Sequence, residues 1–127
     1  MKTLNEVRNL KVNGYMIIDD EPCKILSIST SKPGKHGEAK ARIEAVGLFD
    51  GQKRSVVHPV KHKVGVPMID KRQAQVITTS GESAQIMDLE TYETFDILVD
   101  EEFQGKLEAG GEINYMIARG RTKITRA

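Results

Sequence analysis

Strict alternation of small apolar and charged residues marks the segment Ala39–Ala45 as a half-buried β-strand. Three alanines and one isoleucine occupy every second position, and Lys40, Arg42 and Glu44 stand between them. A period of two places the first set on one face of a strand and the second set on the other, whereas a helix would mix the two sets. The clearest periodicity in the 127 residues is therefore that of a sheet, which favours an all-β architecture.

Further short strands are expected elsewhere in the first half of the chain. Each consists of β-branched, aromatic or other apolar residues bounded by turn-forming residues. The segments are Tyr15–Ile18, Cys23–Ser29, Val46–Phe49 and Arg54–Val57. Asp50-Gly51 lies between the last two and predicts a hairpin turn.

The second half is predicted to contain five short strands and one short helix. The strands are Gln73–Thr79, Ser83–Met87, Glu93–Val99, Glu112–Ala118 and Thr122–Arg126. The helix, Glu101–Leu107, would lie between the third and fourth of them, which is the element order of an OB-fold barrel. Phe95 and Tyr115 occupy inward positions of the alternation, so we expect them in the core and not as base-stacking platforms.

A domain boundary is expected in Gly65–Asp70, where a glycine and a proline interrupt the strand pattern. Residues 1–70 carry 12 Lys and Arg against 8 Asp and Glu, a net +4, whereas residues 71–127 carry 7 against 10, a net −3. No long linker separates the halves. We therefore predict two small barrels, residues 1–69 and 70–127, with the basic first barrel meeting any polyanionic partner.

Several classes of protein and site are disfavoured. No run of about 18 apolar residues could span a membrane, and the N-terminus lacks the apolar stretch of a secretory signal, so a cytoplasmic location is expected. The single cysteine, Cys23, is expected to pack as a small apolar residue. His58 and His62 are expected in loops and not in a zinc site, because only one cysteine could join them as a soft ligand.

A loop too long for a tight hairpin lies between Ser29 and Ala39. Near its middle, Gly34 and Gly37 flank Lys35 and His36. The glycines permit positive φ angles and place no side chain beside the lysine. We therefore expect Lys35 to be displayed at the tip of a protruding loop.

Two enzymatic interpretations of Lys35 fail on inspection. A phosphate-binding loop would require glycine at Ser29 and a hydroxyl residue at His36. A catalytic lysine with a lowered pKa would require a pocket that excludes water, which an exposed tip beside Lys32 and Lys40 does not provide. We therefore expect no enzyme activity and no small-molecule substrate, and a plain solvated basic loop remains an alternative.

The amino-acid sequence of this loop resembles that of the modification loop in the archaeal and eukaryotic translation initiation factor 5A family. The similarity extends over nearly the whole chain. The matching segments are Ser31–Gly37 with Ala39-Lys40, Phe49–Arg54, Asp88–Asp96 and Gly120–Arg126. Pro33 stands where the eukaryotic pattern has Thr, which favours an archaeal-type member, and Glu38 departs from the eukaryotic pattern, which has His.

The resemblance implies an SH3-like barrel followed by an OB-fold and a function in translation. It implies that deoxyhypusine synthase, which uses NAD as its own cofactor, converts Lys35 to deoxyhypusine or hypusine with an aminobutyl group from spermidine. The chain itself would carry no cofactor. Lys32, Gly34, His36, Gly37 and Lys40 would support the modification.

The implied partners are the ribosome and peptidyl-tRNA, beside which the modified lysine would promote peptide-bond formation, notably at consecutive prolines. Arg42, Lys53 and Arg54 are candidate RNA contacts, as are Lys61 and Lys63, although each could equally belong to a solvated face. Two other functions stay open: an unmodified RNA- or ribosome-binding barrel protein, and a protein-interaction adaptor that uses the acidic second half.

Overall fold

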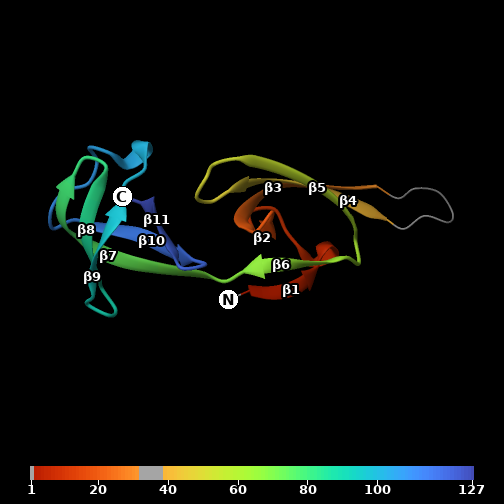
Figure 1. Cartoon of the computed structure of the whole chain (residues 1–127), viewed down its shortest axis with the longest axis horizontal. Coiled ribbons are helices and arrows are strands. Elements are labelled where there is room, and N and C mark those ends of the chain that lie inside the picture. Colours follow the sequence, from red (N-terminus) through yellow and green to blue (C-terminus); the bar gives the residue numbers. More distant parts are fainter. Residues whose placement is uncertain (1, 32–38) are drawn as a thin grey trace. The chain divides into compact units, whose positions relative to one another are not determined.

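The computed structural model describes residues 2–31 and 39–127, and in these residues the regular structure is almost entirely β (Figure 1). The chain divides into two compact units, Met1–Met68 and Ile69–Ala127. The first is an SH3-like barrel and the second an OB-fold barrel, so the predicted fold class is confirmed.

The first unit combines a four-stranded antiparallel sheet with a two-stranded one. The large sheet has the order β2-β3-β4-β5, and the small sheet pairs β1 with β6. The strands are β1 Lys2–Glu6, β2 Tyr15–Ile18, β3 Glu21–Ser31, β4 Lys40–Gly47, β5 Lys53–Pro59 and β6 Lys63–Pro67, with a 3-10 helix η1 at Val7–Asn9. Strand β2 also contacts β6, which brings the two sheets together around one core.

Alternation along β4 supplies the centre of that core. Ala41, Ile43 and Ala45 are buried, while Lys40, Arg42 and Glu44 are exposed, as the sequence predicts. Cys23 is also fully buried, which confirms its packing role, and burial raises the pKa of its thiol.

The second unit is a five-stranded barrel. Its sheet has the order β11-β10-β7-β8-β9, and β11 contacts β9 to close it. The strands are β7 Ile69–Ser80, β8 Ser83–Asp88, β9 Thr94–Leu98, β10 Glu112–Ala118 and β11 Arg121–Arg126. Tyr115 is buried and Phe95 packs edge-on against it at 5.6 Å between ring centroids, so both are core residues as predicted.

Three local predictions need correction. The interruption predicted over Gly65–Asp70 is confined to Met68, because β6 continues to Pro67 and β7 begins at Ile69, and the two compact units divide there. Pro67 is tolerated because it is the last residue of β6 and lies in a two-stranded sheet. The predicted helix is a single 3-10 turn, η2 Glu101–Phe103, and Gly105 follows it with φ +79°. The predicted strand Val46–Phe49 is not a separate element, because Val46 and Gly47 are the last residues of β4 and Leu48 and Phe49 lie in the turn that follows.

One buried carboxylate organises the turn after β8. Asp88 is 2% exposed, and its Oδ1 accepts hydrogen bonds from the N–H groups of Glu90 at 2.7 Å and Thr91 at 3.0 Å. Its Oδ2 accepts from the Tyr115 hydroxyl and from Nη1 of Arg72 at 3.3 Å. Burial alone would raise the pKa of Asp88, but these donors hold that pKa well below its ordinary value.

Asp88→Asn should therefore destabilise the second unit. An amide nitrogen in place of Oδ2 donates and cannot accept, so the buried Tyr115 hydroxyl loses its acceptor, while Arg72 still has Asp70 and Glu90; the cost should be about 2 to 4 kcal/mol. Urea unfolding of the whole chain measures the loss, and hydrogen exchange should quicken in residues 69–127. Asp96→Asn, at an exposed carboxylate of β9, is the matched control, and an equal loss there would contradict the assigned role.

Candidate functional site

Five of the predicted site residues lie outside the described residues. They are Lys32, Gly34, Lys35, His36 and Gly37, and Glu38 lies there too. Their assignments remain predictions. The described structure shows what flanks this segment, namely Ser31 at the end of β3 and Ala39-Lys40 at the start of β4.

The flanks are held together by strand pairing up to their last described residues. Ser31 pairs with Lys40, and Lys40 pairs on its other side with Pro59 of β5. The N–H of Val60 donates to the carbonyl of Ala39 at 3.0 Å. Both ends of the undescribed segment therefore emerge from neighbouring positions of one sheet, and β4, a central strand, fixes the second of them (Figure 1).

The outer face of this sheet carries hydroxyl groups and cations. In the register of β3, β4 and β5, serine side chains share this face with basic ones. The exposed polar residues on it are Lys24, Ser27, Ser29, Ser31, Lys40, Arg42, Glu44, Lys53 and Ser55. Serine hydroxyls and basic side chains are the groups that usually contact nucleic-acid phosphates. The alternating Ser27-Ile28-Ser29-Thr30-Ser31 run was a visible signal that our sequence interpretation did not use.

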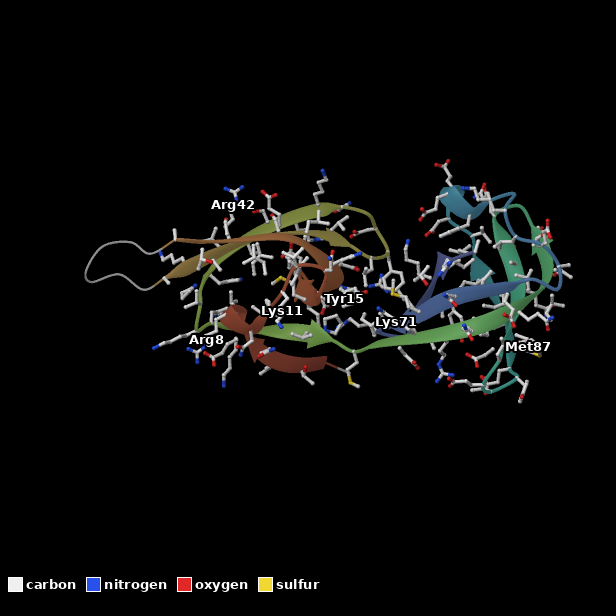
Figure 2. All side chains as sticks on the ribbon, turned by 180° about the vertical axis from the view of Figure 1, so that it is seen from behind. Arg8, Lys11, Tyr15, Arg42, Lys71 and Met87 are labelled. Atoms are coloured by element: carbon white, nitrogen blue, oxygen red, sulfur yellow. The ribbon has the colours of Figure 1, made fainter. Side chains whose placement is uncertain are left out.

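Arg42 and Lys53 keep accessible charges. Arg42 projects from the outer side of the first unit (Figure 2), and its pairing with Glu44 at 3.5 Å joins two side chains that are both more than half exposed. Such exposed pairs contribute little to stability and exchange readily for other partners. Lys53 is exposed and lines a shallow hollow of about 220 Å³ with Leu26, Glu44 and Ser55.

Arg54 has a structural role, although it follows Lys53 directly. Its side chain is 14% exposed, and its Nη2 and Nη1 donate to the two carboxylate oxygens of Asp50 at 2.8 and 3.1 Å. Asp50 also accepts from the N–H of Gln52 at 3.0 Å. The hydrogen bond from Arg54 is the main reason that the pKa of Asp50 falls to about 2. This bidentate pair braces the loop between β4 and β5.

Gly47 is required by the same arrangement. A Cβ atom at this position would stand 2.0 Å from Oδ1 of Asp50 and 2.8 Å from Nη1 of Arg54. The N–H of Gly51 donates to the carbonyl of Gly47 at 3.1 Å. The connection between β4, which ends at Gly47, and β5, which begins at Lys53, is therefore longer than a two-residue Asp50-Gly51 turn.

The two histidines form a stacked pair at the end of β5. Their ring centroids are 4.4 Å apart and the rings are inclined by 18°. His62 is in a turn as predicted, but His58 belongs to β5, which corrects its assignment to a loop. Burial and the neighbouring charge of His62 lower the pKa of His58. In the described part of the chain, no group of three or more His, Cys, Asp or Glu side chains could hold a metal ion.

Arg54→Gln should lower the thermal midpoint of the whole chain by a few degrees, because it removes a bidentate pair from a small domain. The loss should be full above the ordinary Asp50 pKa of 3.8 and should disappear as pH falls towards about 2, since protonated Asp50 no longer attracts the guanidinium. Calorimetry at pH 7 and pH 2 measures both effects. Lys53→Gln is the control. If it lowered the thermal midpoint as much as Arg54→Gln does, Arg54 would have no special structural role.

Comparison with known proteins places the chain among close relatives. A family model described as "Translation initiation factor 5A-like, N-terminal" matches residues 2–62. "Translation initiation factor 5A" of Archaeoglobus fulgidus is 57% identical over 126 residues, which are 99% of this chain and 98% of that protein. The protein of the same name from Thermoplasma acidophilum is 56% identical over 94% of this chain and 92% of its own.

Solved structures agree with these relatives in fold. The structure titled "Eukaryotic translation initiation factor 5A from Methanococcus jannaschii" has a TM-score of 0.91 and 49% identity, and the match covers 98% of this chain and 93% of that one. A family protein from Naegleria fowleri has a TM-score of 0.82 and 37% identity over 98% and 96% of the two chains. In the described residues of the present chain, no helix is long and apolar enough to cross a membrane.

Proposed function

The chain belongs to the translation initiation factor 5A family and is a translation factor, and from this premise we propose that it binds the ribosome beside peptidyl-tRNA through a modified Lys35. The observation that carries the proposal is the near full-length similarity to archaeal members, which spans the Lys35 segment. The geometry supports it, because paired strands lead to that segment and their outer face bears serines and cations. The chain would therefore act in the cytoplasm, on the ribosome.

The modification would be made by a separate enzyme. Deoxyhypusine synthase would transfer the aminobutyl group of spermidine to the side-chain nitrogen of Lys35, forming one C–N bond as another breaks and the diaminopropane remainder leaves. The chain described here would act only as the protein substrate of that enzyme and would keep no cofactor afterwards.

A lengthened lysine suits a narrow RNA-lined passage. The aminobutyl arm adds reach and a second cationic amine, which can make charge-assisted hydrogen bonds to phosphate or ribose oxygens. Ordering the acceptor end of peptidyl-tRNA in this way would favour peptide-bond formation by positioning, notably where consecutive prolines slow it. Lys40, Arg42 and Lys53 would hold the factor on RNA from the sheet behind the loop.

The second candidate is an unmodified RNA- or ribosome-binding protein. The serine and cation face favours it, because that face alone can contact phosphates. Lys35→Arg separates the two candidates, since arginine keeps the charge but lacks the amine nucleophile that the synthase needs.

We expect Lys35→Arg, as the only copy in the native host, to lose translation through consecutive prolines while melting at the wild-type temperature. Intact mass of the native wild-type protein should show the added aminobutyl group, with or without a hydroxyl. Wild-type translation by the variant, or a native mass without the addition, would leave the unmodified RNA-binding protein as the better account. Protein made in bacteria is unsuitable for the mass test because the modifying enzyme would be missing.

The outer face of the first unit should also set the salt dependence of ribosome binding. Arg42→Gln with Lys53→Gln removes two accessible cations, so the slope of log affinity against log salt should become shallower by about 1 to 2. The matched control is Lys106→Gln with Arg126→Gln, two exposed cations of the second unit. A larger change of this slope in the control variant would contradict the proposal and indicate that the second unit contacts the RNA.

A further inference from the structure

The stacked histidines form a built platform that the proposed use of Lys35 does not require. His58 is half-buried in β5, and the chain turns back after Pro59 so that the exposed His62 lies against it, with 4.4 Å between ring centroids. The N–H of His62 donates to the carbonyl of Pro59 at 3.0 Å and closes this turn. One face of the His62 ring is covered by His58, so the opposite face is the accessible one.

The backbone on both sides of the platform is fixed. The carbonyl of His62 accepts from the N–H of Val7 at 2.8 Å, and the carbonyl of Val60 accepts from the N–H of Arg8 at 2.9 Å. The N–H of Val60 is itself bonded to Ala39. The 3-10 helix η1 and the start of β4 therefore both hold the turn that carries His62, and the ring is oriented before any partner arrives.

Cations surround the platform. Lys61 and Lys63 are exposed neighbours of His62, and Arg8 lies on the adjoining helix η1 (Figure 2). Glu6 is the nearby acid, and it is bonded to Arg8 at 3.3 Å and stands opposite Lys63 in the β1–β6 register. The balance is positive, which favours an anionic partner.

The arrangement disfavours other uses of the two rings. A metal ion would need ring nitrogens that converge on one point, but nearly parallel rings direct their in-plane lone pairs side by side. Core packing does not account for an exposed His62. An acidic peptide could use the lysines but would gain nothing from an open aromatic face, whereas an unpaired nucleotide offers a flat base and a phosphate together.

We propose that His62 is a stacking platform for an unpaired base of RNA, with Lys61 and Lys63 contacting the flanking phosphates. The proposal rests on the proposed function in that the partner would be RNA beside the ribosome-bound loop. The platform lies close to the base of the Lys35 segment, since Pro59 pairs with Lys40, the residue opposite Ser31; His58 pairs with the buried Ala41, so its side chain is on the inner side of the sheet and not on the serine and cation face.

The test measures binding of short RNA to the whole chain made in bacteria, so that modification of Lys35 plays no part. The probes are a fluorescent single-stranded RNA of six nucleotides and the same strand with abasic residues, read by anisotropy at fixed low salt. One stacked base should make the intact strand bind about five- to tenfold more tightly than the abasic strand. His62→Ala should abolish this preference, and His62→Phe should keep it because phenylalanine retains a flat ring.

Two further variants sharpen the result. Tyr92→Ala, at a tyrosine that is 70% exposed in the second unit, should leave the preference unchanged. Lys61→Gln with Lys63→Gln should weaken intact and abasic strands alike, because those residues would contact phosphates. Thermal melting of each variant checks the fold, and His62→Phe keeps the test decisive should the alanine variant be destabilised.

Three outcomes would overturn the platform: equal binding of intact and abasic strands by the wild type, an undiminished preference in His62→Ala, or loss of the preference in a well-folded His62→Phe. These outcomes are independent of the Lys35 mechanism. A native mass without the aminobutyl addition would reject that mechanism and leave the stacking result intact, whereas failure of the stacking test would leave the modification untouched.

Discussion

The register of β4 is the constraint on which the first unit depends. Ala41, Ile43 and Ala45 are buried almost completely, and each lies opposite residues of both β3 and β5. A slip of one residue would bury Lys40, Arg42 and Glu44 and expose the apolar set, which no local rearrangement could compensate. The same register aligns Ser31 with Lys40 and so brings together the two ends of the Lys35 segment. The register of β4 therefore determines both the packing of the core and the position of the candidate site.

Two adjacent basic residues of β5 have different environments, because successive side chains of a strand point to opposite faces of the sheet. Lys53 faces solvent on the outer side of the sheet, while Arg54 is held by Asp50 and is only 14% exposed. An ion pair of that geometry stabilises a loop and leaves little capacity for a new partner. The cations that stay accessible to a partner are therefore those with weak, exposed ion pairs, such as Arg42 with Glu44, and not every basic residue of this region.

The second unit uses its buried polar residue differently. Asp88 is surrounded by backbone N–H groups, a tyrosine hydroxyl and a guanidinium, so its charge is compensated from several strands and not by one partner. Such a fully satisfied network specifies one arrangement of the β8–β9 turn and the barrel core. The same unit differs from the first in charge, since residues 71–127 carry a net −3.

The sequence by itself determined the β class, the alternation of β4, the strand β10 with its inward Tyr115, and the family motif around Lys35. These features are local, since a period of two or a short motif is complete within a few residues. Strands β1 and β6 escaped prediction because polar and turn-forming residues such as Thr3, Asn5, Gly65 and Pro67 obscure any alternation. The two strands form only by pairing with each other across some sixty residues. Likewise, only tertiary structure decided that Arg54 pairs with Asp50, that serines of β3 share a face with cations of β4, and that His62 folds back onto His58. Contacts of this kind depend on which distant strands pack together, and no local pattern encodes the free energy of that packing.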